Sequence, residues 1–177
     1  MKEAVGGTWL FGIVITFIIF FTTYISMSTN YAKSFKVKDE ILITIEHYKG
    51  VNSSSIGRIN NYLDEVGYYA SGDCNGYGEN DDVRLGRAKY SDWMGFNFNQ
   101  ADNSPTSNVG NVNYCIRQAV FESGDKISAH PRSALYQVVV FFSLDWPVIG
   151  SLLNVRIEGE TSVIHMYTYE AKYTFTS

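Results

Sequence analysis

Apolar residues fill the first part of the chain almost without a break. Residues 8–27 read TWLFGIVITFIIFFTTYISM, and residues 4–32 carry no charge. A helix of twenty residues is about 30 Å long, which matches the hydrocarbon thickness of a bilayer. We therefore predict a transmembrane helix over residues 8–30, preceded by a short leader at residues 1–7.

Two other structures could account for this apolar run. A secretory signal peptide has an apolar core of about 7–15 residues, followed by a cleavage site with small residues. The run here is longer, and residues 22–27, TTYISM, make a poor cleavage site. A helix buried in the core of a soluble domain is the other alternative. We favour the uncleaved membrane helix.

The helix is predicted to continue beyond the membrane. Val37, Ile41, Ile45 and Tyr48 recur at spacings of four, four and three, which is the apolar stripe of an amphipathic helix. Gly50 is a natural end for it. One continuous helix over residues 8–48 would place half its length in lipid and lay its stripe on the following domain.

The remainder of the chain predicts an α+β fold. A second short helix is expected over residues 56–66, with its N-cap among residues 53–55. Residues 71–111 are rich in Gly, Asn and Asp and predict irregular structure. Alternating or continuous apolar patterns then predict strands, which short turns would join into an antiparallel sheet packed on the long helix. These strands are expected near residues 113–121, 134–144, 152–160 and 163–175.

The orientation in the membrane is less directly indicated. Lys33, Lys36 and Lys38 follow the apolar run, while Lys2 precedes it and is offset by Glu3. A count of positive charges alone would place the large domain inside. A long domain can nevertheless be translocated despite such charges, and this one is rich in Asn, Gly, Ser, Thr and Tyr. We predict a single-pass protein with a cytoplasmic leader and an extracytoplasmic domain over residues 31–177.

The chain has two cysteines, Cys74 and Cys115. In an oxidising compartment an even number of cysteines predicts a disulfide, which agrees with a domain outside the cell. Two buried free thiols are the alternative.

Charge and motifs argue against several classes of function. The net charge is −4 and no stretch has clustered Lys or Arg, so nucleic-acid binding is not expected. No nucleophile elbow, zinc-protease helix or phosphate-binding loop occurs. Asp73 begins a partial match to a calcium loop, but Arg84 stands where that loop needs a carboxylate. We expect no cofactor, no metal and no enzymatic activity.

The arrangement resembles a known family. A short leader ends in Gly6 and Gly7, the apolar helix begins at Thr8, and an amphipathic extension and a small β domain follow. The stretches WPVIGSLL at 146–153 and VRIEGET at 155–161 are also similar to the family. The chain resembles the pilin-like proteins of type IV pilus systems, and most closely the TadE-like pseudopilins of tight-adherence systems.

The resemblance implies a non-enzymatic subunit of a bacterial surface appendage or secretion system. Its partners would be membrane lipid and other pilin-like subunits or membrane components of the secretion system. It also implies processing of the leader at Gly6, Gly7 and Thr8, and a place in a surface filament. One departure is clear: such families usually carry a glutamate five residues into the mature helix, where this chain has Gly12. The alternative is that Gly6 and Gly7 are ordinary residues ahead of a membrane anchor.

Association through the apolar helix would depend on close packing and hydroxyl groups. The candidate residues for it are Gly12, Thr16, Thr22, Thr23 and Ser26. Small and hydroxylated residues also occur in helices that only anchor. A membrane-anchored extracellular binding module that never polymerises is therefore the second functional hypothesis, and an anchored enzyme is the third.

Overall fold

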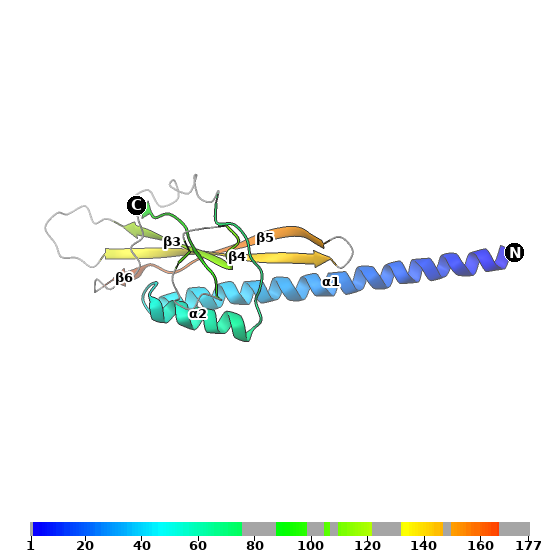
Figure 1. The fold of residues 1–177 in the computed structure, drawn as a ribbon, viewed down its shortest axis with the longest axis horizontal. Helices are drawn as coiled ribbons and strands as arrows, with labels where there is room; N and C mark the ends of the chain where they lie inside the picture. Colours follow the sequence, from blue (N-terminus) through cyan, green and yellow to red (C-terminus); the bar gives the residue numbers. More distant parts are fainter. Residues whose placement is uncertain are drawn as a thin grey trace.

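The protein consists of one long helix, a short helix and a six-stranded antiparallel sheet (Figure 1). The computed structural model describes residues 2–75, 88–98, 105–106, 110–121, 132–146 and 150–166. The predicted α+β class is confirmed. The elements are α1 (Lys2–His47), α2 (Ser53–Glu65), β1 (Ala88–Tyr90), β2 (Met94–Phe96), β3 (Tyr114–Phe121), β4 (Arg132–Trp146), β5 (Gly150–Glu160) and β6 (Ile164–Met166).

Helix α1 runs unbroken for 46 residues. It ends at His47, after which Lys49 and Gly50 both have positive φ angles, 54° and 140°. The amide of Gly50 donates to the carbonyl of Ile45 at 2.9 Å, which closes the last turn. Gly50 therefore ends the helix as predicted, since glycine adopts such angles without steric cost.

The second half of α1 packs on the sheet through its apolar stripe. Val37, Ile41 and Ile45 are fully buried in the main core, together with residues of α2 and of the sheet. Tyr48 does not belong to this stripe: it is exposed, because the helix has already ended at His47. The prediction for Tyr48 was therefore wrong, whereas the other three positions are confirmed.

Strand β4 is the centre of the sheet, and its residues 134–142 are buried on both faces. The strand order is β1-β3-β4-β5, with β2 also pairing β3 and β6 also pairing β4. Val138 and Val140 lie in the main core beside α1 and α2, whereas Val139 and Phe141 lie in a second cluster with the two cysteines. Because successive residues of a strand point to opposite faces, one strand serves both clusters.

Contacts at both ends of its packed half tie α1 to the domain. The Lys33 ammonium donates to the carbonyl of Gly67 at 2.7 Å, just after α2. At the other end, the Glu46 carboxylate accepts from the amide and the hydroxyl of Ser162, at 2.6 and 2.9 Å. Between them, β5 comes so close that a Cβ on Gly159 would lie 2.8 Å from the side chains of Lys38 and Leu42.

Several predicted boundaries need correction. Asn52 caps helix α2. Its side chain accepts a hydrogen bond from the Ser55 amide, and the Ser55 side chain accepts one from the Asn52 amide. The cap therefore lies one residue before the predicted range. The region 71–111 contains two three-residue strands, β1 and β2, that were not predicted. The predicted final strand at 163–175 is present as β6 over Ile164–Met166, and residues 167–177 lie outside the described part.

Candidate membrane anchor and association surface

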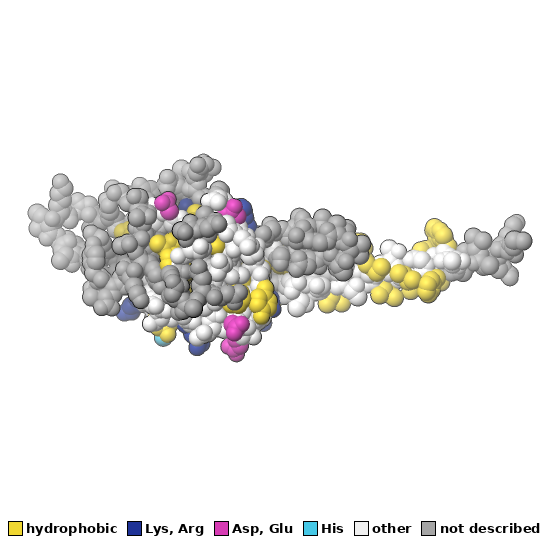
Figure 2. Space-filling model, in the orientation of Figure 1, with side chains coloured by type: hydrophobic (Ala, Val, Ile, Leu, Met, Phe, Trp, Pro, Cys, Tyr) yellow, Lys and Arg dark blue, Asp and Glu magenta, His cyan; other side chains and the backbone are white. Residues whose placement is uncertain are grey.

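The first half of α1 projects from the domain and is exposed (Figure 1). Of residues 8–32, all are exposed except Thr23, which is half-buried. The exposed side chains include large apolar ones such as Trp9 at 74% and Phe20 at 71% exposure. Figure 2 shows apolar side chains along this projecting segment. An exposed apolar surface of this extent is typical of a membrane or protein contact.

Within the described residues, α1 is the one helix long and apolar enough to cross a membrane. Its most apolar window has a mean hydropathy of 2.2 and none of that window is buried in the fold. The nearest charged residues on either side are Glu3 and Lys33. The length and composition expected of a single-pass anchor are therefore present.

Gly12 lies in a shallow groove on the exposed helix. The groove is lined by Thr8, Trp9, Gly12, Ile13, Thr16, Phe17 and Phe20. A Cβ on Gly12 would meet nothing within 4 Å. Thr8, Gly12 and Thr16 are four residues apart, so they share one face of the helix and form a small-residue ridge. Sequence reasoning missed the place of Thr8 on this face, although the spacing was a sufficient signal.

The threonine hydroxyls of this segment donate within their own helix. Thr16 donates to the Gly12 carbonyl at 2.9 Å, and Thr23 to the Ile19 carbonyl at 2.8 Å. Thr22 lies 3.0 Å from the Ile19 carbonyl and 3.1 Å from that of Ile18. These hydroxyls can accept a hydrogen bond from a neighbouring helix, but each already donates its own proton to a carbonyl of α1. Ser26 is exposed on the same segment.

The leader residues lie inside α1. The helix begins at Lys2, so the backbones of Gly6 and Gly7 are helical and Thr8 continues the same helix. Cleavage of the chain at this point stays a prediction.

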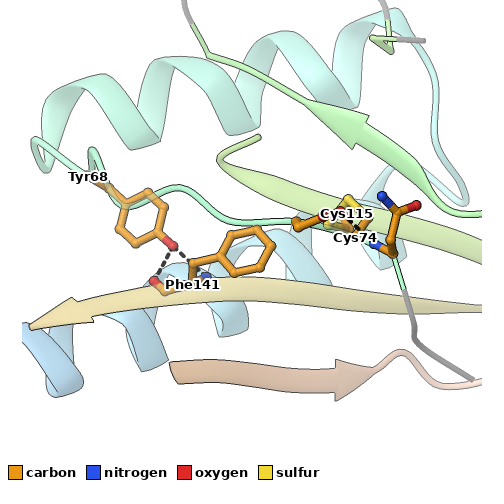
Figure 3. Close-up of a disulfide and its surroundings, with 6 residues drawn as sticks. Tyr68, Cys74, Cys115 and Phe141 are labelled. Carbon is orange, nitrogen blue, oxygen red and sulfur yellow. Dashed lines mark hydrogen bonds between the residues drawn. A yellow bond between two sulfur atoms is a disulfide. The ribbon is translucent and has the colours of Figure 1, made fainter. Parts of the chain in front are cut away.

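Cys74 and Cys115 are joined by a disulfide, as predicted (Figure 3). Both are fully buried, in a cluster with Val112, Val139 and Phe141. Gly72 holds the segment before Cys74 against the sheet, because it exchanges two backbone hydrogen bonds with Val112 at 2.8 and 2.9 Å. The disulfide therefore fixes the chain that follows α2 to the face of the sheet opposite α1.

Tyr68 completes the sheet where β3 stops. The β3–β4 ladder ends at the pair Tyr114 and Val140. At the next residue of β4, the Tyr68 hydroxyl accepts from the Phe141 amide at 2.8 Å and donates to the Phe141 carbonyl at 2.5 Å (Figure 3). Burial raises the pKa of Tyr68, so the hydroxyl keeps the proton that it donates.

A small pocket marks the place where α1 leaves the domain. The Lys33 side chain crosses it to reach the Gly67 carbonyl, and the Ser34 hydroxyl lies 3.3 Å from the Phe141 carbonyl. These contacts hold α1 at a fixed position on the domain. The pocket is lined by Asn30, Lys33, Ser34, Gly67, Tyr68, Tyr69, Ala70 and Phe142.

A polar row crosses the other face of the sheet, and it is buried at Arg117 and Gln137 and exposed at Glu160. Arg117, Gln137 and Glu160 lie opposite one another on β3, β4 and β5. The Arg117 guanidinium donates to the Gln137 side chain, whose amide nitrogen lies 2.5 Å from a Glu160 oxygen. The same guanidinium stacks on the rings of Tyr90 and Trp93, at 4.5 and 4.7 Å. These hydrogen bonds link β3, β4 and β5, so the row serves structure.

Reactive groups are few in the described part of the chain. The sulfurs of Cys74 and Cys115 are bonded to each other, so neither is a free thiol in this structure. No group of three or more His, Cys, Asp or Glu residues there could hold a metal ion. Asp73, the start of the partial calcium-loop match, accepts from the Asn75 amide at 2.8 Å, and most of that match lies outside the described residues.

No family model, no curated protein and no solved structure matches this chain.

Proposed function

We propose that this protein is a non-enzymatic, membrane-anchored, pilin-like subunit of a bacterial tight-adherence or type IV pilus-like system. The observation that carries the proposal is the division of α1 into two halves. One half is an exposed apolar rod of membrane length, and the other is buried against an antiparallel sheet. The rod would sit in the membrane or in a helical core of subunits, and the domain would face outside.

The geometry supports a subunit whose helix and domain move as one body. Contacts at Lys33 and Glu46 fix the two ends of the packed half, and the core residues fill the space between them. A force or a contact applied to the projecting half would therefore be transmitted to the domain without a flexible joint.

Association is expected to use the small-residue face rather than an ion pair. Residues 4–32 have no acidic side chain that could bind the amine of a neighbouring subunit. In lipid, helices associate by close approach at small residues. The ridge of Thr8, Gly12 and Thr16 is the face on this segment where a second backbone can come closest.

Replacing Gly12 with Leu is predicted to reduce association while leaving membrane insertion intact. A bulky side chain on the ridge would hold the neighbouring helix away, and a loss of about 1–2 kcal/mol corresponds to roughly a tenfold weaker contact. The measurement is chemical crosslinking of the full chain in cells, compared with the wild type. Val14→Leu is the matched control, because Val14 lies on roughly the opposite side of the helix at about 100° per residue.

A different outcome would favour the second function, a membrane-anchored binding module that does not polymerise. Its support is that the threonine hydroxyls of the anchor donate within their own helix. Equal crosslinking of Gly12→Leu, Val14→Leu and wild type, or none in any of them, would contradict association through this face. Loss of residues 1–7 from the mature chain would instead strengthen the pilin-like proposal.

A further inference from the structure

A polar pocket lies on the side of the domain that faces the projecting half of α1. Helix α2 ends on this side, and the chain turns there at Gly67, which has a φ angle of 60° (Figure 1). Asn30 and Lys33 of α1 line the pocket together with Gly67 and Tyr69 from the segment after α2. Its volume is about 180 Å³, several times the roughly 30 Å³ that one water molecule occupies in the liquid, so a phosphate group can enter it.

Lys33 supplies this pocket with a cation. Its side chain is half-buried, and its ammonium donates to the Gly67 carbonyl at 2.7 Å. An ammonium has three donors, so two remain beyond that bond. Within the part of the chain that the structure describes, Lys33 forms no ion pair, and Asp64 and Glu65 at the end of α2 do not neutralise it. A half-buried cation with further donors suits an anionic ligand.

Tyrosines border the same cation. A Cβ on Gly67 would lie 3.8 Å from the Lys33 ammonium and 3.6 Å from the Tyr69 ring, so the ammonium and the ring lie on either side of one point. The Tyr69 side chain is 70% exposed, although its ring centre lies 5.5 Å from that of Phe98. Tyr31, two residues before Lys33 on α1, is also exposed. Exposed tyrosines are typical of the headgroup zone, because the ring is apolar and the hydroxyl is polar.

The length of the apolar helix places Lys33 at the level of the headgroups. From the middle of residues 8–27 to Lys33 there are about 15 residues, or about 23 Å along the helix axis. A bilayer with its headgroup regions is about 40–45 Å thick, so each half measures about 20–22 Å. Lys33 is the first charged residue after the apolar run, and its Cα–Cβ bond tilts toward the helix N-terminus, which is the direction of the bilayer.

We infer that the pocket beside Lys33 binds the phosphate of a bilayer phospholipid on the domain's side of the membrane. Lys33 would bind the phosphate, and Tyr31 and Tyr69 would lie among the neighbouring headgroups. A free phosphate ion offers the same charge, but the depth of Lys33 and the exposed tyrosines favour the lipid. This inference rests on the proposed membrane anchoring by α1. The bound lipid would fix the height of the domain above the bilayer.

A titration of the full chain in micelles of an uncharged detergent tests the pocket. The probe is the short-chain lipid dihexanoyl phosphatidylglycerol, and the signal is the NMR shift of the Gly67 amide. We expect a saturable shift in the wild type and binding about tenfold weaker in Lys33→Gln, the change expected when a hydrogen bond to a charged group is lost. Lys33→Arg should retain binding. Lys36→Gln is the matched control, because Lys36 is exposed on the same helix and its loss removes the same charge.

Three results of this titration would overturn the inference without touching the anchor. They are the absence of a saturable shift, equal affinity in wild type and Lys33→Gln, and equal weakening by Lys36→Gln, which would indicate general attraction between charges. Inorganic phosphate that binds as tightly as the short-chain lipid would overturn lipid as the ligand.

The anchor is tested separately, with the full chain in lipid nanodiscs. A nitroxide deep in the acyl chains should broaden the Gly12 amide signal and leave that of Val139, in the second core cluster, unchanged. If the Gly12 signal is not broadened, the anchoring proposal fails, and the assignment of the pocket to bilayer lipid fails with it. Broadening at Gly12 together with an unresponsive Gly67 in the titration would overturn the lipid site alone.

Discussion

Replacing Cys74 and Cys115 with alanine is expected to lower the free energy of unfolding by about 4 kcal/mol. The disulfide closes a loop of 41 residues, and the chain-entropy model assigns this value to a loop of that size. The bond also holds together a cluster that contains Val139 and Phe141 of the central strand. Its loss would free the segment after α2 from one face of the sheet.

Thermal unfolding in detergent, followed by the circular dichroism of the domain, provides the measurement. At roughly 2–4 °C per kcal/mol for a chain of this size, the midpoint should fall by about 8–16 °C. The wild type treated with reductant should show a similar fall once the bond is broken. An unchanged midpoint in the double variant would contradict the structural role of the disulfide. Complete alkylation of both cysteines without reductant would show that the bond does not form.

Replacing Gly72 with alanine is the second change with a large expected effect, a loss of roughly 3 kcal/mol. The new Cβ would lie 2.2 Å from the Phe141 ring, far closer than atoms can approach. The backbone at Gly72 cannot easily move away from the ring, because Gly72 is hydrogen-bonded to Val112 and lies two residues from the Cys74 disulfide. Overpacking of a core typically costs about 1–3 kcal/mol, and this site is at the upper end of that range.

A double-mutant cycle can test whether the Phe141 ring is the cause. In a Phe141→Ala background the obstacle is absent, so Gly72→Ala should cost much less there, with a coupling energy between the two sites toward the upper end of the range of about 0.5–3 kcal/mol that is usual for contacting residues. An equal cost in both backgrounds would contradict the proposed clash. Gly12→Ala is a second control that does not depend on the folding of Phe141→Ala, because its Cβ would meet nothing within 4 Å. It should leave the stability of the domain unchanged.

Local patterns were sufficient to predict the elements that carry the architecture. The charge-free run and the stripe of Val37, Ile41 and Ile45 identified one long helix, and Gly50 identified its end, because both signals depend on neighbouring residues. The apolar run around Val138 to Val140 identified one of the strands. The two cysteines were paired from their number and compartment alone.

Other features depend on contacts between distant residues and had no local signal. The Tyr68 hydroxyl forms hydrogen bonds with the backbone amide and carbonyl of Phe141, which is 73 residues away. These groups are available because β3 ends one residue before it would pair with Phe141. The row of Arg117, Gln137 and Glu160 exists only once the strand register is known. The three-residue strands β1 and β2 are too short for an alternating pattern to be read. Their place is determined by pairing with β3.

Some errors were local and could have been avoided. Asn52 is as good a cap as the serines that follow it, and Ser55 three residues later completes a reciprocal pair of hydrogen bonds. The common face of Thr8, Gly12 and Thr16 also follows from spacing alone. In both cases the correct residue lay at the edge of the range that was considered.

The central claim is that α1 anchors the chain in a membrane with the domain outside, and protease accessibility tests it most directly. Protease would be added to intact, wall-stripped cells that contain the full chain, with a cytoplasmic protein as the control for leakage. We predict that residues 28–177 are degraded and that a membrane-bound fragment containing residues 8–27 survives. A domain that remains intact until the cells are permeabilised would contradict this account.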